Sequence, residues 1–355
     1  MITNKRWSII LLTVIITLLL SLGTLIAVID PYFHYHAPLA MLEYPLKSER
    51  YQNDGIVKHF EYDAIITGSS MTQNFKTSEF DELFGVNSVK VSFSGGSFKE
   101  VNENLQRALE ANSEIKIVLR GLDYAKMMQE KDNVTYTLDS YPAYLYDDKW
   151  YNDVKYLLNK YVLIDTEHVI RYTMSGNKTT TFDEYSNWMD YHTFGYDAVS
   201  ERYIRQEKSN EVHKFTIQNA ETLCGNLKQN VIRLAEENPQ IQFYLFFTPY
   251  SIYYWDSLKQ SGDLEKQLQA EKMAIEILLE YDNIYLYSFS DEFDMICNLN
   301  NYLDILHYGE DINSKILLCM HRKEHLLTKE NYQEYCSKIH KFYTTFDYDS
   351  MFRSM

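Results

Sequence analysis

The stretch DAIITGSSMTQNF, residues 63–75, sets a short apolar run directly before a glycine and two adjacent serines. An ordinary strand-to-helix turn needs only one capping residue, so Gly68, Ser69 and Ser70 together suggest a further role at the end of a strand. The apolar run itself, Ala64–Thr67, has the length of a buried strand. Four similar runs follow along the chain, at Val89–Ser92, Ile115–Leu119, Phe243–Phe247 and Ile284–Tyr287.

Helix-like patterns separate or follow these runs. They cover 77–84, Lys99–Ala111, Thr216–Glu237, Leu264–Glu280, Asp311–Met320 and Lys329–Tyr343. Strands that alternate with helices predict a parallel sheet with helices on both faces. At 355 residues and 45% hydrophobic content, the chain is long enough to bury one sizeable core. We therefore expect a three-layer, flavodoxin-like α/β fold.

The N-terminal region has the pattern of a membrane anchor. Lys5 and Arg6 precede Trp7–Ile29, which contains no charged residue and is long enough to cross a hydrocarbon core of about 30 Å. A cleavable signal has only about 7–15 apolar residues before a small-x-small site. We predict an uncleaved anchor over residues 1–29, with removal as the alternative. The cationic flank predicts a cytoplasmic N-terminus, with the chain after Asp30 outside the cell membrane.

Three further segments follow the anchor. We expect a stalk over 30–60 and an α/β domain over 61–347, with an insertion at 126–214. The insertion is rich in aromatic residues, and the whole chain has 31 Tyr, 18 Phe and 4 Trp. Insertions of this length are often lids or subdomains, and aromatic side chains suit sugar rings or lipid surfaces. A helical cap that only completes the fold is the alternative.

Composition excludes several functions. The formal net charge of −16 argues against nucleic acid as a partner, because phosphate neutralisation needs clustered Lys and Arg. His321 and His325 are four apart but lack an HExxH pattern and a third ligand, so we predict neither a metal nor a cofactor. The four cysteines form no CxxC pair, and their pairing stays unassigned. They are Cys224, Cys297, Cys319 and Cys336.

Polar residues follow the predicted strands where ligands bind in parallel sheets, beyond the carboxyl ends. The candidate stretches are Gly68–Ser70, Ser94–Ser97, Gly121–Tyr124, Thr248–Ser251 and Asn301–Tyr308. A serine of the first stretch needs a base that is itself held by a third group. Asp304 and His307 can supply both roles. The backbone amides of Ser70 and Gly95 are candidate donors to an oxyanion.

These residues resemble a known family. Gly68-Ser69-Ser70-Met71, the Ser94-Gly95 turn and Asp304-x-x-His307 are similar to the first, second and fifth blocks of the SGNH/GDSL hydrolase superfamily. The resemblance implies that Ser70 is the nucleophile and that Ser69 replaces the family's aspartate; Ser69 as nucleophile is the alternative. The GSS variant with an anchor is similar to the D-alanine transfer proteins of lipoteichoic acid synthesis. The likeness covers 60–125 and 240–320, and not the insertion.

One block departs from the family pattern. The third block normally supplies an asparagine donor to the oxyanion, whereas this chain reads Arg120-Gly121-Leu122-Asp123. Loss of one such donor typically costs about 10²–10³ in rate. We expect the hydroxyl of Tyr124 or Tyr250 to substitute, or else a slow, specialised or inactive site. Tyr250, Asp123 and Tyr124 are our predicted substrate contacts.

These observations predict a membrane-anchored serine acyl-transfer enzyme that uses Ser70, His307 and Asp304. The resemblance implies acyl esters of cell-envelope glycans as substrates, and both hydrolysis and transfer remain open. Expected partners are a glycan or teichoic-acid-like polymer, the membrane, and a membrane-bound O-acyltransferase. The alternative is a non-catalytic glycan-binding or scaffolding component of a surface-polymer modification complex.

Overall fold

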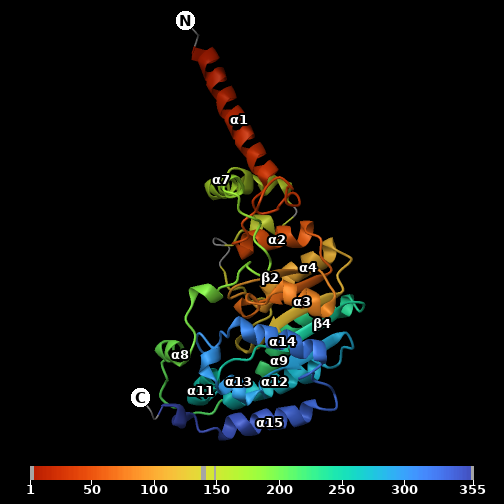
Figure 1. Cartoon of the computed structure of the whole chain (residues 1–355), viewed down its shortest axis with the longest axis vertical. Coiled ribbons are helices and arrows are strands. Elements are labelled where there is room, and N and C mark those ends of the chain that lie inside the picture. The colour runs from red at the N-terminus through yellow and green to blue at the C-terminus, as the bar shows by residue number, and fades with distance from the viewer. Residues whose placement is uncertain (1–3, 137–140, 148, 353–355) are drawn as a thin grey trace. The chain divides into compact units, whose positions relative to one another are not determined.

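A computed structural model describes residues 4–136, 141–147 and 149–352. The chain forms two compact units (Figure 1). We call the first the anchor unit; it comprises the described residues of Met1–Glu61 and Tyr136–Thr181. The second is the sheet unit, which comprises Tyr62–Thr135 and the described residues from Phe182 onward. The predicted insertion at 126–214 is thus divided between the two units.

Five parallel strands form the sheet of the second unit, in the order β2-β1-β3-β4-β5. Their bounds are β1 Ala64–Gly68, β2 Ser88–Ser92, β3 Ile117–Leu122, β4 Gln242–Phe247 and β5 Ile284–Ser288. Every residue of β1, β2 and β3 is buried. Apolar residues dominate β1 and β3, whereas β2 alternates valine with the buried polar residues Ser88, Lys90 and Ser92. The predicted α/β fold with a parallel sheet is confirmed. β3 begins two residues later than predicted and extends to Leu122.

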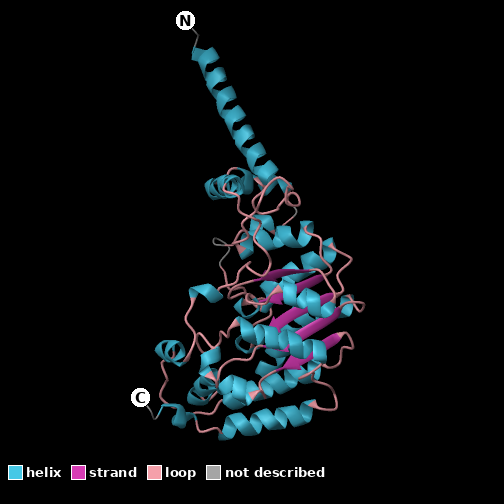
Figure 2. Cartoon of the chain, viewed as in Figure 1, coloured by secondary structure: helices cyan, strands magenta, loops and turns pink. Residues whose placement is uncertain are grey.

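Helices cover both faces of this sheet (Figure 2). On one face, the ring of Tyr244 on β4 lies 5.3 Å from that of Phe84 on α3 (Thr77–Phe84), and α14 (Glu310–Arg322) packs against α3. Arg120 of β3 pairs in register with Leu245 and so points to the opposite face. There it donates a hydrogen bond of 3.2 Å to the carbonyl oxygen of Phe98 on α4.

The remaining helices of the sheet unit lie between and after the strands. They are α4 Phe98–Ala111, α5 Tyr124–Met127, α8 Tyr196–Arg202, α9 Ile217–Leu227, α10 Arg233–Glu237, α11 Ile252–Ser261, α12 Leu264–Leu278, α13 Phe293–Cys297 and α15 Tyr332–Thr345. A π-helical turn, Lys228–Ile232, joins α9 to α10. Short 3₁₀ turns are Ser70–Thr72, Met189–Tyr191, Leu299–Asn301 and Tyr348–Phe352. The helix α11 was not predicted.

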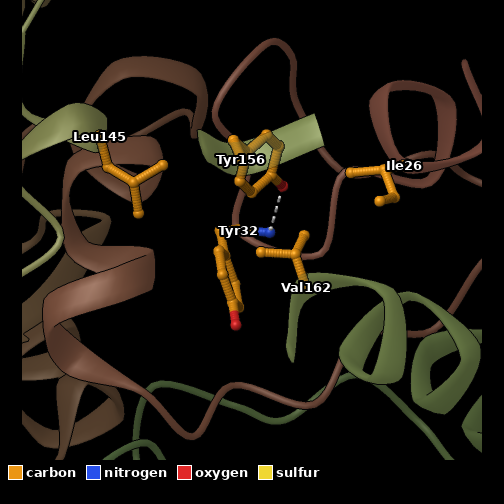
Figure 3. Packing of buried hydrophobic residues seen from close by; sticks show 5 residues of the cluster. All are labelled: Ile26, Tyr32, Leu145, Tyr156 and Val162. Carbon is orange, nitrogen blue, oxygen red and sulfur yellow. Dashed lines mark hydrogen bonds between the residues drawn. The ribbon is translucent and has the colours of Figure 1, made fainter. Parts of the chain in front are cut away.

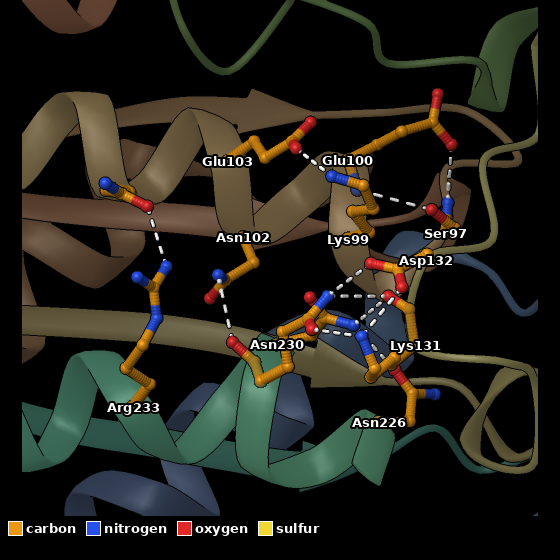
Figure 4. A network of polar contacts seen from close by, with 12 residues as sticks. Ser97, Lys99, Glu100, Asn102, Glu103, Lys131, Asp132, Asn226, Asn230 and Arg233 are labelled. Carbon is orange, nitrogen blue, oxygen red and sulfur yellow. Dashed lines mark hydrogen bonds and ion pairs between the residues drawn. The ribbon is translucent and has the colours of Figure 1, made fainter. Parts of the chain in front are cut away.

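On the face of the sheet to which Arg120 points, hydrogen bonds between polar side chains and backbone groups connect α4, the π-helical turn after α9 and the segment after α5 (Figure 4). Ser97 and Glu100 form a capping box that starts α4. Asn102 of α4 donates to the carbonyl oxygen of Gln229 in the π-helical turn. Asn230 in the same turn donates to the carbonyl oxygen of Lys131, in the segment that follows α5. The loops after β2 and β3 are therefore tied to the same helical layer.

The anchor unit begins with α1, Asn4–Ile29, an apolar helix long enough to cross a membrane or act as a signal anchor. Its other helices are α2 Glu49–His59, α6 Val154–Leu157 and α7 Lys160–Met174, with 3₁₀ turns at Ala143–Leu145 and Trp150–Asn152. α2 lies within the predicted stalk and was not predicted, because its sequence ERYQNDGIVKH shows no apolar periodicity.

Asp30 terminates α1 and organises the chain that follows it. Its carboxylate accepts hydrogen bonds from the amides of His34, Tyr35 and His36 and from the hydroxyl of Tyr156. Tyr156, which donates to Asp30, belongs to an apolar cluster of the anchor unit (Figure 3). Its members are Ile26, Tyr32, Leu145, Tyr156 and Val162. Leu145, Tyr156 and Val162 therefore share a core with the C-terminal end of α1.

Candidate active site

The turn after β1 presents Ser70 at the carboxyl edge of the sheet. Gly68 has φ +150°, and a Cβ there would lie 2.7 Å from Cγ2 of Thr72, so only glycine fits. The buried Ser69 hydroxyl accepts a hydrogen bond from the amide of Met71, and Thr72 Oγ1 donates a hydrogen bond to the Ser69 carbonyl oxygen. The Ser69 side chain thus stabilises the turn, whereas the Ser70 side chain lines a cleft.

The loop that carries Asp304 and His307 is closed by a short antiparallel bridge between Tyr302 and Tyr308. The amide of Leu303 donates to the His307 carbonyl oxygen at 2.8 Å. The hydroxyl and amide of Ser251, which follows β4, both donate to the carbonyl oxygen of Ile305. The strand end of β4 therefore fixes the position of the loop that faces Ser70.

A continuous line of hydrogen bonds joins the three predicted residues. Ser70 Oγ lies 2.8 Å from Nε2 of His307, and Nδ1 of His307 lies 2.8 Å from Oδ2 of Asp304. Burial would raise the pKa of the Asp304 carboxyl, but hydrogen bonds from the imidazole and from two backbone amides hold it below its usual value. The carboxylate is thus ionised and orients the ring.

The two predicted oxyanion donors are backbone amides of separate turns. In the described part of the chain, neither the amide of Ser70 nor that of Gly95 has a hydrogen-bond acceptor. Gly95 has φ +66°, a conformation that favours glycine. Its carbonyl oxygen accepts the hydroxyl of Thr135 at 2.8 Å, and the Lys126 ammonium donates to the next carbonyl oxygen, that of Gly96. Both contacts hold the Gly95 turn in place.

The end of β3 differs from our prediction. Tyr250 donates to Asp123 at 2.9 Å, and both residues are buried. Tyr124 is also buried, and its hydroxyl contacts Glu271 at 2.9 Å and Ser290 at 2.6 Å. Because these three predicted contacts are occupied inside the core, none of them lines the cleft beside Ser70. Their burial argues against the predicted contact with substrate, so we leave them out of the candidate site.

An aromatic wall, formed by Trp188, His192 and Phe194, stands beside His307. The rings of Trp188 and His307 meet edge to face at 5.5 Å, and Trp188 stacks on Phe194 at 6.0 Å. The indole Nε1 donates to the carbonyl oxygen of Ser70 at 3.4 Å. We had not singled out these residues, although they lie in the aromatic stretch FDEYSNWMDYHTF, residues 182–194.

The cleft at Ser70 has a volume of about 460 Å³. Besides Ser70, His307 and Asp304, residues that line it include Trp188, His192, Ser94, Gln73 and Arg202. Nη1 of Arg202 donates to the carbonyl oxygen of Leu303, so a cation borders the loop of Asp304. The cleft thus combines an aromatic wall with one basic side chain and several polar groups.

Comparison with known proteins gives a weak structural match. No family model and no curated protein matches the chain. One solved structure that does match is described as "The structure of a putative platelet activating factor from Streptococcus pneumonia". The match has a TM-score of 0.36 and 12% sequence identity, and covers 78% of this chain and 89% of that chain.

The arrangement at the cleft has the components of serine chemistry. A hydroxyl contacts an imidazole, and the imidazole contacts an ionised carboxylate. Two open amides belong to the turns that follow β1 and β2. Parallel strands bring these turns to one edge, because β1 and β2 are neighbours in the sheet. The two candidate metal ligands lie elsewhere: His325 pairs with Asp291 and Glu292, and His321 contacts the ring of Phe84.

Proposed function

We propose that this protein is a membrane-anchored serine acyl-transfer enzyme, with Ser70 as nucleophile, His307 as general base and Asp304 as the group that orients it. The single observation that carries the proposal is the unbroken line of 2.8 Å contacts from Ser70 through His307 to Asp304. A serine hydroxyl is a weak nucleophile until such a base takes its proton. The open cleft beside Ser70 gives an ester access to it.

In the proposed first half-reaction, Oγ of Ser70 attacks the carbonyl carbon of an ester while Nε2 of His307 takes the hydroxyl proton. The carbonyl oxygen becomes an oxyanion, and the amides of Ser70 and Gly95 are its proposed donors. His307 then returns the proton to the leaving alcohol as the ester C–O bond breaks. The acyl group remains on Ser70.

In the second half-reaction, His307 takes the proton of the acyl acceptor as the acceptor attacks the acyl carbonyl carbon. His307 then returns this proton to Oγ of Ser70 as the bond between Oγ and the acyl group breaks. Water as acceptor gives hydrolysis, whereas a sugar hydroxyl gives a new ester. The aromatic wall supports a glycan as substrate, because indole and phenyl rings stack on the apolar faces of sugar rings. We propose O-acyl esters of cell-envelope glycans or of teichoic-acid-like polymers as the substrate class.

Location and partners form part of the same proposal. Lys5 and Arg6 precede the apolar part of α1, which supports a cytoplasmic N-terminus and a sheet unit outside the cell. An acyl group made in the cytoplasm would then need a carrier across the membrane. A membrane-bound O-acyltransferase is the partner that we propose for this step.

One observation favours a second candidate function. The position where the family's asparagine would donate holds Leu122, whose side chain is fully buried, and the next residue, Asp123, is held by Tyr250. A site with fewer oxyanion donors suits a protein that binds glycans and has lost turnover. This candidate is a non-catalytic glycan-binding component of a polymer modification complex.

Labelling with a fluorophosphonate probe tests the proposal. The full chain in detergent micelles is incubated with the probe and its intact mass is measured. We expect one probe adduct on the wild type and none on Ser70→Ala or His307→Gln. Ser69→Ala and Ser94→Ala are matched controls that should keep the adduct, because Ser69 supports the turn and Ser94 lines the cleft without contacting His307.

Two outcomes would contradict the catalytic proposal. An adduct that persists in Ser70→Ala would place the reactive serine elsewhere. Folded wild type without an adduct, combined with polysaccharide binding that Ser70→Ala leaves unchanged, would favour the glycan-binding candidate. Thermal unfolding of each variant establishes that the comparison is between folded proteins.

A further inference from the structure

An apolar groove of about 600 Å³ runs along the C-terminal third of α1 in the anchor unit. One side of the groove is α1 itself, from Leu19 to Ala27. The other side is formed by the 3₁₀ turn at Trp150–Asn152 and by α6. At Gly23 the two sides are in close contact, since a Cβ there would lie 3.7 Å from the Cβ of Leu157, an ordinary van der Waals distance. A segment far along the chain therefore lies against a helix with the composition of a membrane span.

The depth of the groove follows from helix geometry. From Leu19 to the end of α1 at Ile29 is about 15 Å at 1.5 Å rise per residue, which is half of a hydrocarbon core of about 30 Å. If α1 spans the bilayer, its groove-lining residues lie within one leaflet. Any segment packed beside them lies at the same depth, between the middle of the bilayer and the boundary of acyl chains and headgroups.

The side chains of the segment Trp150–Ile164, which we call the interface segment, match that depth. Tyr156 and Val162 of this segment are buried in the apolar cluster, but other large apolar side chains are exposed, with Trp150 82%, Tyr161 64% and Ile164 57% accessible. Val154 and Leu158 are exposed as well and line the groove. Trp and Tyr concentrate at membrane interfaces, where the ring is apolar and its polar group reaches water. Figure 1 shows α7, which contributes part of this segment, beside the end of α1.

Charge points to the kind of lipid. The chain has a formal net charge of −16, yet Lys149, Lys155 and Lys160 lie in or next to the interface segment and are exposed. None of the three forms an ion pair with a described carboxylate. Asp153, which also lines the groove, accepts a hydrogen bond from the hydroxyl of Tyr35. Exposed lysines beside exposed aromatic residues can attract an anionic lipid headgroup.

We propose that the interface segment lies in the leaflet around the C-terminal end of α1, that an acyl chain of an anionic phospholipid fills the groove, and that the three lysines attract its headgroup. The inference rests on the proposed membrane anchoring and extends it from one helix to a second, internal segment. The anchor unit is then seated in the membrane through two contacts, which restricts how it can tilt and rotate there.

Quenching of tryptophan fluorescence by brominated acyl chains tests this. The full chain is reconstituted in nanodiscs of phosphatidylglycerol and phosphatidylcholine, with and without bromine on the acyl chains. The parent carries Trp7→Phe, which removes the tryptophan of α1 and leaves Trp150, Trp188 and Trp255. We expect brominated lipid to lower the parent's emission, and we expect the additional Trp150→Phe change to remove that loss. Equal quenching in the two proteins would overturn the inference.

The tryptophan of α1 separates this inference from the anchoring on which it rests. If brominated lipid quenches the wild type more than Trp7→Phe, α1 lies in the bilayer. If Trp150 is not quenched in the same samples, the proposed placement of the interface segment is wrong while the anchoring stands, and water or protein fills the groove. No quenching of Trp7 overturns the anchoring. Fluorophosphonate labelling of the same samples reports on Ser70 independently of either result.

A second comparison tests the preference for anionic lipid. In the Trp7→Phe parent, we expect brominated phosphatidylglycerol to quench Trp150 more than brominated phosphatidylcholine. The triple change of Lys149, Lys155 and Lys160 to Gln should abolish that difference. The control changes three exposed lysines of the sheet unit to Gln and alters net charge equally; they are Lys116, Lys272 and Lys329. A preference that survives the first triple, or is lost in the control, would contradict the role of these lysines.

Discussion

Two strand ends at the same edge of the sheet have opposite environments. β1 and β3 are neighbours, and each is followed directly by polar residues. Ser70, after β1, opens into a cleft and contacts His307, whereas Asp123, after β3, is 3% exposed and accepts the hydroxyl of Tyr250. A place at the carboxyl edge is therefore insufficient for a binding role; the side chains that pack above the strand end decide it.

Aromatic packing accounts for the difference. Tyr124 stacks on Phe247 at 5.4 Å and meets Trp255 edge to face at 5.7 Å. Tyr250 meets Tyr254 at 4.7 Å. These rings bury the end of β3. Beside β1, by contrast, Trp188 stands at one side of the cleft and leaves Ser70 accessible.

Removing the proposed nucleophile or the proposed base should have the largest effect. Replacement of Ser70 by Ala or of His307 by Gln should lower kcat for a small acyl ester by about 10⁶, because neither group works without the other. Unfolding temperatures should change little, since both side chains border a cleft. Ser69→Ala is the matched change within the same turn. Equal losses in Ser69→Ala and Ser70→Ala would mean that the turn was disrupted.

Asp304→Asn should lower kcat by about 10⁴, because the amide cannot stabilise the imidazolium that forms. It also affects stability with a defined sign. The pKa of Asp304 is lowered in the fold, so its ionised form stabilises the protein above the ordinary Asp pKa, and that contribution is lost as pH falls through the folded value. Thermal unfolding of wild type and variant should therefore converge on acidification. A constant difference across pH would contradict this.

Glu271 accepts a hydrogen bond from Tyr124, next to the buried end of β3, and its pKa predicts that stability depends on pH in the opposite sense. Burial raises its pKa from 4.5 to about 7, against the hydrogen bonds from Tyr335 and Tyr124. A raised pKa stabilises the fold below pH 4.5, and this contribution is lost as pH rises to about 7. Glu271→Gln should remove up to about 3 kcal/mol of this pH dependence, measured by denaturant unfolding between these two pH values. Parallel stability curves for the two proteins would contradict the shift.

Tyr250→Phe gives the smallest expected effect and the sharpest contrast between the strand ends. The change leaves the Asp123 carboxylate without its hydroxyl donor in a buried position, which should cost about 1–3 kcal/mol in the free energy of unfolding. Probe labelling of Ser70 should keep its wild-type rate. Asp123→Asn, which retains an acceptor, is the milder control. A large drop in labelling without loss of stability would restore Tyr250 as a site residue.

The sheet was largely predictable from the chain alone. Short runs rich in β-branched and aromatic residues mark these strands, so β1, β2, β4 and β5 were located to within one residue at each end. α4 was equally plain, since Ser97 and Glu100 cap it. The helix α2 was not predictable from the sequence, because its buried polar residues form hydrogen bonds with distant backbone groups. Gln52, for example, donates to the carbonyl oxygens of Pro31 and Pro45.

The candidate site was predictable only in part. Ser70, Asp304 and His307 carry reactive groups in a recognisable order, and the turn of Gly95 needs a glycine conformation. Tyr124 and Tyr250 were misplaced, because a tyrosine hydroxyl serves a core carboxylate as readily as a ligand. Trp188 was one aromatic residue among many, and nothing in its neighbours along the chain indicates that it meets His307.

What the sequence alone determined was the parallel α/β sheet, the apolar N-terminal helix and the reactive side chains that follow the strands. These depend on local patterns: apolar runs, capping residues and spacing along one loop. Only the tertiary structure decided that Ser70, not Asp123, faces a cleft, that Trp188 and His192 line this cleft, and that Trp150 lies beside α1. Such contacts join residues far apart in the chain, and they depend on packing that no local pattern contains.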